Sequence, residues 1–209
     1  MPSAPNVLRW DGKPGHYEVY YVTLTDPASG IGAWIRYTMV APLERSGEPP
    51  SASLWFLTMD PNGGVLGRKA MFPADALRAA SDPFELRIGE AVLTDSGMEG
   101  SFEDVAWDLR WVPGRSYETV HPLLRRVAST ILVLPHADVA IEGTISFGGR
   151  TVQLDDQETA GLRVVGMYGS LRRFDRQDIH HLDGSRHDAG CDDAGHGSAC
   201  FVGTVERGQ

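Results

Sequence analysis

The sequence predicts an all-β protein, an antiparallel barrel or sandwich of about eight to ten short strands with one or two small helices. Segments in which apolar and polar residues alternate, rich in β-branched and aromatic side chains, recur along the chain. Turn sequences with Gly, Pro, Asn and Asp separate these segments. Strands do not alternate regularly with helices, so a parallel sheet is not expected.

The first hairpin follows an N-terminal arm, residues 1–15, that is rich in Pro, Ser, Asn and Gly. Tyr17–Thr25 has the alternation of a strand, and Ile31–Val40 is the predicted returning strand. The sequence DPASG at residues 26–30 connects them as a turn, because its proline presets one φ and Gly30 permits a positive one.

The remaining strands are predicted from the same signals. They are expected at Ala52–Met59, from the DPNGG turn to Phe72, and at Phe84–Ile88, Ala91–Thr94, Met98–Phe102, Val105–Trp111, Val139–Phe147 and Arg150–Leu154. Phe72–Ala80 is expected to form a short helix, because Pro73 and Asp75 suit its first turn. Helical spacing of apolar residues predicts a second short helix at His121–Thr130.

The faces of two predicted strands point to a binding site. If Thr25 pairs with Ile31, Glu18 and Arg36 share one face of the first hairpin and lie diagonal to each other, within reach of long side chains. The pair is then either a surface salt bridge of small energetic value or a buried pair inside a barrel lumen, held for a ligand. In the strand at 105–111, the tryptophans are expected to face inward and Asp108 outward; in the lumen, Asp108 would be a candidate proton donor.

Composition limits the partners and the compartment. The chain has 209 residues and a formal net charge of −9, so nucleic-acid backbones and anionic membranes are poor partners. No basic segment followed by an apolar run opens the sequence, and no apolar run is long enough to span a bilayer. Cysteine is confined to Cys191 and Cys200, so a disulfide framework is not expected in the main body. These features favour a cytoplasmic protein.

Three regions are expected: the arm at residues 1–15, a barrel domain at 16–160, and a tail of low order at 161–209. The tail is rich in Gly, Asp, Arg and His and loses strand periodicity, so it buries little apolar surface to offset its ordering entropy. Its histidines and cysteines suggest a zinc site, but Cys191 and Cys200 lie too far apart for the usual spacing. We therefore expect no metal and no cofactor.

The motifs resemble those of a known family. The segment WDGKPGHYEVYYVTLTDPASGIGAWIRY, followed in order by ASLWF, FPADAL, FELRIG, VAWDLRW and VAIEGTISFGGRTVQL, resembles the N-terminal half of lipocalin-like (calycin) proteins related to hydroxyneurosporene synthase, the carotenoid 1,2-hydratase. The resemblance covers about residues 8–155. It implies an antiparallel up-and-down β-barrel with an apolar lumen, in a family whose members usually carry two such halves and include hydratases and cyclisation catalysts.

The chain departs from that family pattern after the last hairpin. Val164 stands where the family has a glutamine and Gly166 where it has a histidine, and no tryptophan follows Gly161. The catalytic residues of the hydratase therefore have no counterparts that can be named here, and they remain unknown. Either a disrupted reading frame near residue 160 or a divergent tail would explain the change.

Three functions are consistent with these observations. The first is binding of an apolar isoprenoid- or polyketide-like molecule in the barrel lumen, by the residues Glu18, Tyr20, Trp34, Arg36, Trp55 and Trp107. The second is a hydratase or cyclase acting on such a molecule, and the third is an inactive remnant of a two-barrel protein. An uncovered apolar face would also favour self-association.

Overall fold

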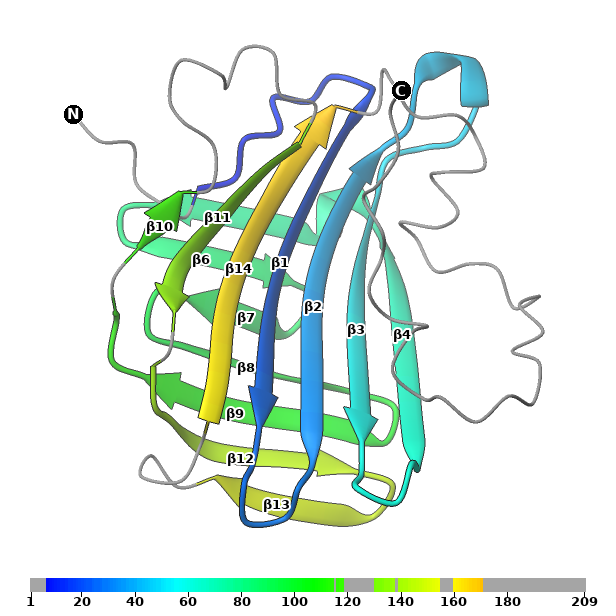
Figure 1. Ribbon diagram of the computed structural model, residues 1–209. Helices are drawn as coiled ribbons and strands as arrows, with labels where there is room; N and C mark the ends of the chain where they lie inside the picture. The colour runs from blue at the N-terminus through cyan, green and yellow to red at the C-terminus, as the bar shows by residue number, and fades with distance from the viewer. Residues whose placement is uncertain (1–6, 115, 119–129, 138, 155–159, 171–209) are drawn as a thin grey trace, which may run out of the picture.

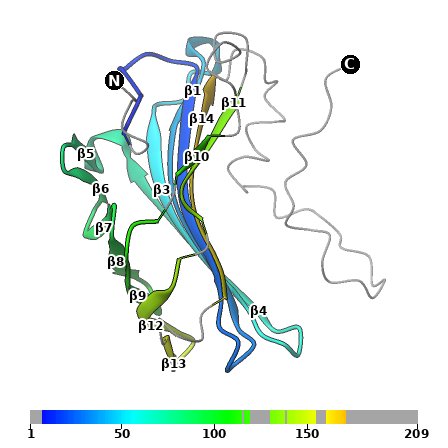
Figure 2. The same cartoon turned by 60° about the vertical axis from the view of Figure 1, so that its left-hand side comes forward.

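The described residues form two antiparallel β-sheets of seven strands each, which face one another as two layers. This computed structural model describes residues 7–114, 116–118, 130–137, 139–154 and 160–170. In Figure 1 the long strands of the first sheet run across those of the second, and Figure 2 shows the two layers from the side. Among the described strands, no hydrogen-bonded ladder joins the sheets, so the expected barrel is not closed there.

The first sheet is built on long hairpins from the N-terminal part of the chain. Its strands are β1 (His16–Thr25), β2 (Gly32–Ala41), β3 (Ser51–Met59), β4 (Val65–Pro73), β10 (Tyr117–Glu118), β11 (Thr130–Ala137) and β14 (Ala160–Ser170). Their order is β10-β11-β14-β1-β2-β3-β4. A short 3-10 helix, Glu44–Ser46, lies between β2 and β3.

The second sheet is a meander of shorter strands. It contains β5 (Leu77–Ser81), β6 (Phe84–Ile88), β7 (Ala91–Thr94), β8 (Gly97–Phe102), β9 (Val105–Trp111), β12 (Ile141–Phe147) and β13 (Arg150–Leu154). Their order is β13-β12-β9-β8-β7-β6-β5. The expected hairpin between β12 and β13 is confirmed, with Phe147 opposite Arg150.

The prediction of a helix at Phe72–Ala80 is wrong. Only Ala74–Ala76 form a 3-10 turn there, while β4 extends to Pro73 and β5 begins at Leu77. One turn lets the chain pass from the first sheet to the second, where the following residues gain ladder hydrogen bonds that a helix would forfeit. The second predicted helix lies outside the described residues except for Thr130, which begins β11.

The expectation of low order after residue 160 is wrong for its first ten residues. Strand β14 runs antiparallel to both β1 and β11, with Met167 opposite Val19 on one side and Leu132 on the other. It therefore fills an interior position of the first sheet, in the middle of Figure 1. Backbone pairing with its two neighbours orders this segment as a strand, which its side-chain pattern did not predict. Residues 171–209 lie outside the described residues.

The core lies between the sheets and is lined by alternate residues of each strand. From the first sheet it takes Tyr20, Val22, Leu24, Ala33, Ile35, Tyr37, Met39, Leu54 and Phe56, and from the second Phe84, Leu86, Ile88, Leu93, Met98, Trp107, Leu109, Trp111, Ile141 and Ile145. In β9 the buried residues are Val105, Trp107, Leu109 and Trp111, while Asp108 and Arg110 are exposed. The expected alternation of that strand is confirmed.

Candidate functional site

The pairing of β1 with β2 differs from the expected pairing by one residue. Thr25 lies opposite Gly32 and not opposite Ile31. A slip of one residue moves every side chain of the return strand to the other face, because side chains alternate along a strand. The prediction that Glu18 and Arg36 share a face and contact each other is therefore wrong: Glu18 faces the second sheet and Arg36 faces away from it.

The loop at residues 26–31 explains the register. The backbone N–H of Asp26 donates to the carbonyl of Ile31 at 2.9 Å, and the Asp26 carboxylate accepts the N–H of Ser29 at 3.0 Å. Gly30 has the positive φ that was expected, 70°. The buried aspartate thus closes a loop one residue longer than the proline and glycine signals suggest.

The six residues predicted to line one ligand site are divided between two faces. Glu18, Tyr20 and Trp107 are on the inner side of their sheets, whereas Trp34, Arg36 and Trp55 are on the outer side of the first sheet. The predicted ring of side chains around a lumen is therefore not formed.

The outer residues form a row across four strands. Cross-strand pairing places Tyr21 opposite Arg36, Arg36 opposite Trp55, and Trp55 opposite Lys69. The Arg36 guanidinium carbon lies 5.4 Å from the centre of the Trp34 ring and 5.3 Å from that of Trp55. Lys69 Nζ lies 4.5 Å from the Trp55 ring. Aromatic and cationic side chains therefore alternate along this row, in the geometry of cation–π contacts.

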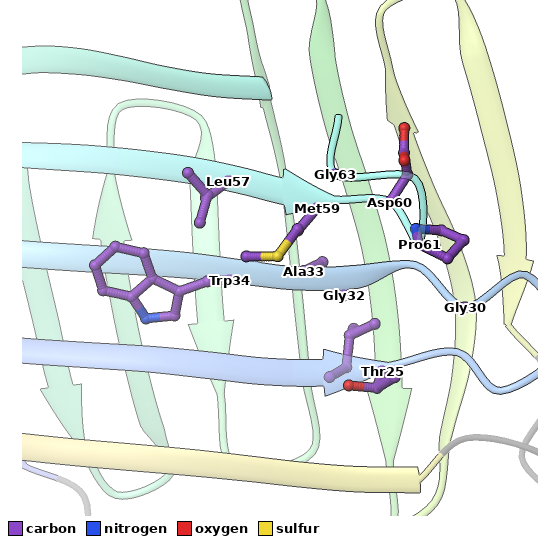
Figure 3. A pocket seen from close by; sticks show the side chains of 11 residues that line it. Thr25, Gly30, Gly32, Ala33, Trp34, Leu57, Met59, Asp60, Pro61 and Gly63 are labelled. Atoms are coloured by element: carbon purple, nitrogen blue, oxygen red, sulfur yellow. The ribbon is translucent and has the colours of Figure 1, made fainter. Parts of the chain in front are cut away.

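A groove continues from this row toward the turns at one end of the sheet (Figure 3). It has a volume of about 550 Å³, and its lining residues include Gly32 and Trp34 from β2, Leu57 and Met59 from β3, and Pro61 of the following turn. Trp34 and Leu57 lie opposite each other on neighbouring strands. The groove is mainly apolar, and Trp34 connects it to Arg36.

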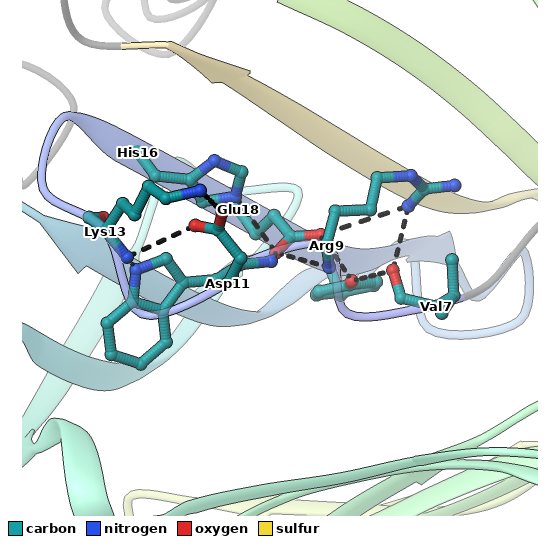
Figure 4. Close-up of polar contacts among 8 residues, drawn as sticks. Val7, Arg9, Asp11, Lys13, His16 and Glu18 are labelled. Atoms are coloured by element: carbon teal, nitrogen blue, oxygen red, sulfur yellow. Dashed lines mark hydrogen bonds and ion pairs between the residues drawn. The ribbon is translucent and has the colours of Figure 1, made fainter.

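On the inner face, Glu18 fastens the N-terminal arm to β1 (Figure 4). Its side chain is fully buried, and its oxygens accept the backbone N–H groups of Arg9 and Trp10 at 2.9 Å. Nε2 of His16 lies 3.1 Å from one oxygen, and the Tyr20 hydroxyl lies 2.9 Å from the other. A carboxylate shared among so many donors acts as an anchor for the arm.

The Tyr20 hydroxyl completes this cluster. It lies 2.8 Å from the carbonyl oxygen of Val7 and 2.9 Å from Glu18 Oε1, so it has two acceptors within reach. Burial, together with the nearby Glu18 charge, raises the pKa of Tyr20 far above its ordinary value. The Tyr20 hydroxyl therefore remains a hydrogen-bond donor across the physiological pH range, so it can hold the arm in place.

Trp107 has a packing role at the centre of the molecule. Its ring stacks on Phe56 with centroids 6.0 Å apart and meets Tyr37 edge-on at 6.4 Å. Trp107 Nε1 donates to the Tyr37 hydroxyl at 3.3 Å, which in turn donates to the Val92 carbonyl at 3.0 Å. Burial strongly raises the pKa of Tyr37. These contacts join β9 to β2 and β3, so Trp107 connects the two sheets.

His136 in β11 is a buried histidine whose ring lies 6.3 Å from the ring of Trp111. It is 5% exposed, and its Nδ1 accepts the N–H of Gly114 at 3.2 Å. Burial lowers its pKa, although the charge of Asp95 acts in the opposite direction. Within the described part of the chain, no cluster of three or more His, Cys, Asp or Glu side chains could hold a metal ion. The tail histidines and cysteines lie outside that part.

Comparison with known sequences finds relatives without an assigned function. The chain is 33% identical over 174 residues to the uncharacterized proteins Rv0493c and MT0513 of Mycobacterium tuberculosis, and the match covers 79% of this chain. It spans about half, 50%, of the length of those relatives. No family model matches the sequence.

Solved structures with the same fold are more distant in sequence. A putative AttH from Nitrosomonas europaea superposes with a TM-score of 0.57 at 14% identity, covering 82% of this chain and 60% of that one. CghA, in a structure with Sch210972, gives a TM-score of 0.55 at 9% identity, covering 80% and 50%. Together with the two antiparallel sheets, these likenesses establish an all-β, lipocalin-like fold. In the described residues, no helix has the length and apolarity needed to cross a membrane.

Proposed function

We propose that this chain binds a small apolar molecule on the outer face of its first sheet. The observation that carries this proposal is the groove lined by Trp34, Leu57 and Met59, on the side of the sheet that faces away from the core. Its volume of about 550 Å³ is in the range of small-molecule sites, and its lining is mainly apolar with a few polar groups at its ends.

This location retains part of the predicted ligand site and moves it from the lumen to the outer face. Trp34, Arg36 and Trp55 remain candidate ligand residues, because they adjoin the groove. Trp107 is assigned to packing by its contacts with Tyr37 and Phe56. The structure of CghA with Sch210972 supports the proposal to the extent that a protein of this fold holds a bound compound.

The alternative of a hydratase or cyclase, suggested by the resemblance to carotenoid hydratases, has less support. Such a reaction needs a group that can move a proton near the substrate. The fully buried carboxylate of Glu18 is the strongest candidate among the described residues, but its oxygens already accept hydrogen bonds from the arm. Binding is therefore the function that the geometry supports best.

Fluorescence titration with N-phenyl-1-naphthylamine, a neutral apolar probe, tests the proposal. We expect saturable binding that Trp34→Ala or Leu57→Ala weakens about tenfold, because each removes apolar contact area. Val112→Ala is the matched control, since Val112 is 81% exposed and lies outside the groove. Absence of saturable binding, or an equal loss in the control variant, would refute a ligand site in this groove.

A further inference from the structure

We infer that the groove on the outer face accepts a flat, uncharged ring, which lies on the backbone of Gly32. Gly32 determines this specificity, because a side chain at that position would fill the space that the ring occupies. This inference rests on the proposed function and specifies the chemistry of the ligand. The class is a neutral aromatic or fused-ring compound.

Gly32 lies in the floor of the groove. It precedes Trp34 by two residues in β2 and therefore shares the outer face with it. Cross-strand pairing places Thr25 of β1 on one side of Gly32 and Met59 of β3 on the other, and both residues also line the groove. Figure 3 shows β2 running between the strands that carry them. Gly32 is thus a position without a side chain among neighbours that have one.

The fold itself does not require a glycine at position 32. The backbone there does not adopt a positive φ. The atoms nearest to an added Cβ would be the carbonyl oxygens of Leu24 and Met59, both at 3.9 Å, which leaves open space for a side chain. Glycine in the interior of a strand is less stable than a residue with a Cβ. A strand glycine that the backbone does not need marks a place where a ligand can approach closely.

The glycines of β8, β12 and β4 differ from Gly32. An added Cβ would lie 2.7 Å from a backbone carbonyl oxygen at Gly97 and 2.6 Å from an indole carbon at Gly100, and Gly143 has a φ of 129°. Gly67 is unobstructed, but it lies exposed on the edge strand β4 and does not line the groove. Among the glycines of β2, β4, β8 and β12, Gly32 is therefore the one whose missing side chain opens the groove.

The missing side chain also sets the depth of the groove (Figure 3). Trp34 and Leu57 lie at the end nearest the middle of the sheet, and Pro61 lies at the turn end. Between them the floor is the backbone of Gly32, so the groove is one side chain deep there. A flat ring fills a space of this depth and contacts the Trp34 indole and the Met59 sulfur, both of which favour aromatic partners. A cage-shaped body would extend beyond the groove into solvent.

The lining residues favour a ring without charge. Among the described residues that line the groove, Asp60 has the only ionisable side chain. Its carboxylate accepts the N–H groups of Asn62 at 2.7 Å and Gly64 at 3.1 Å, so it is engaged in the turn. A charged ring would lose its water of hydration in the groove without gaining a dedicated partner of opposite charge. The part of the ligand that lies on Gly32 is therefore neutral.

Two neutral alcohols that differ in shape test the ligand class. 2-Naphthol is flat and 1-adamantanol is cage-shaped, while both have the same number of carbon atoms and one hydroxyl group. Isothermal titration calorimetry of the full chain measures the affinity for each. We expect 2-naphthol to bind about tenfold more tightly than 1-adamantanol, because the flat ring makes more contact with the floor and walls of the groove.

Substitutions of Gly32 test its role. Gly32→Val fills the floor of the groove and should weaken 2-naphthol binding about tenfold or more, and Gly32→Ala should weaken it less. The melting temperature should stay the same or rise in both variants, because a residue with a Cβ suits a strand better than glycine. A glycine that the fold needs would instead lower the melting temperature when replaced. Gly67→Ala is the matched control on the same face, and it should leave the affinity within about twofold.

The outcomes distinguish the inference from the function beneath it. If N-phenyl-1-naphthylamine and both alcohols fail to bind saturably, the proposed function fails and the inference fails with it. If N-phenyl-1-naphthylamine binds and 2-naphthol binds no more tightly than 1-adamantanol, the function stands and the flat-ring class is overturned. Unchanged 2-naphthol binding in Gly32→Val, or an equal loss in Gly32→Ala and Gly67→Ala, would overturn the role of Gly32.

Discussion

Glu18 shows how one buried carboxylate organises a chain terminus. Its position on the inner face of β1 brings the backbone of Arg9 and Trp10 against the edge of the core. Leu8 and Trp10 pack against the core from there. Hydrogen bonds at 2.9 Å from the Arg9 and Trp10 N–H groups and from the Tyr20 hydroxyl offset the cost of burying this charge, and Arg9 Nη1 lies 3.9 Å from the carboxylate.

Glu18→Gln tests this role. The amide offers one acceptor where the carboxylate offers two and turns a donor group toward the arm N–H groups, so we expect a loss of about 3 kcal/mol in the free energy of unfolding. Urea denaturation gives the value, with Glu142→Gln on the exposed side of β12 as a control that should change it by less than about 0.5 kcal/mol. A similar small change in both variants would mean that the arm is not anchored through Glu18.

His136 predicts a pH dependence of stability. Its pKa is lower in the folded protein than in the unfolded chain, so the unfolded chain binds the proton more readily and acid favours unfolding. The free energy of unfolding should therefore decrease as the pH falls below about 6.5 and be at its full value above it. His136→Asn keeps an acceptor for the Gly114 N–H but does not titrate, and it should show a smaller decrease between pH 7.5 and 5 in urea denaturation. Identical slopes would contradict the prediction.

At the scale of elements, β14 is the strand that sequence patterns did not reveal. The run AGLRVVGMYGS has three glycines and one arginine, and it does not alternate clearly between apolar and polar residues. It is nevertheless an interior strand, because β1 and β11 each offer it a row of backbone donors and acceptors. Pairing on both sides stabilises a strand whatever its alternation, so long as its backbone is satisfied.

Met167→Pro tests the interior position of β14. Proline cannot donate a ladder hydrogen bond, and Met167 is paired with both Val19 and Leu132. We expect the free energy of unfolding to fall by about 2 kcal/mol or more, whereas Met167→Val, which keeps the N–H, should cost less. Equal effects of the two substitutions in thermal or chemical denaturation would show that this strand is not held between two neighbours.

At the scale of the whole molecule, the two faces of the first sheet have different tasks. The inner face meets the second sheet through aromatic contacts around Trp107. The outer face carries the row of Tyr21, Arg36, Trp55 and Lys69. Substitutions on the inner face should therefore change the stability of the fold, and substitutions on the outer face should change ligand binding.

Two tryptophan variants make that separation measurable. Trp107→Ala should lower the free energy of unfolding by about 3–5 kcal/mol, the range for deleting a buried aromatic ring. Trp55→Ala, on the half-buried outer side, should cost clearly less stability and weaken binding of N-phenyl-1-naphthylamine. The proposed division of the sheet would be wrong if Trp55→Ala were the more destabilising of the two in urea denaturation.

Self-association also belongs to this scale and remains a prediction. The expected outward set included Ile35 and Tyr37, which instead face the core. Tyr17 and Val19 lie on the outer side of β1, but each is only 2% exposed, so they do not form an uncovered apolar face. At the edge strand β4, Val65 and Met71 are 55% and 52% exposed. Size-exclusion chromatography with light scattering measures the consequence, and a concentration-independent monomer would contradict it.

The sequence alone determined the all-β class, most strand positions, and the alternation within each strand. These follow from local chemistry: β-branched and aromatic residues favour extended backbone, and glycine, proline and aspartate mark the turns. The resemblance on its motifs pointed correctly to a lipocalin-like fold, and the alternation of β9 correctly placed Trp107 inside and Asp108 outside.

Tertiary structure alone decided which residues meet across strands. A buried Asp26 moved the first hairpin by one residue, and that single step separated Glu18 from Arg36 by the thickness of the sheet. Likewise, β14 is ordered by neighbours that are distant in the chain, which no local pattern contains. Pairing register and interior strand position depend on hydrogen bonds between remote segments. A one-residue difference in register, which composition does not reveal, therefore decides on which face of the sheet a candidate site is assembled.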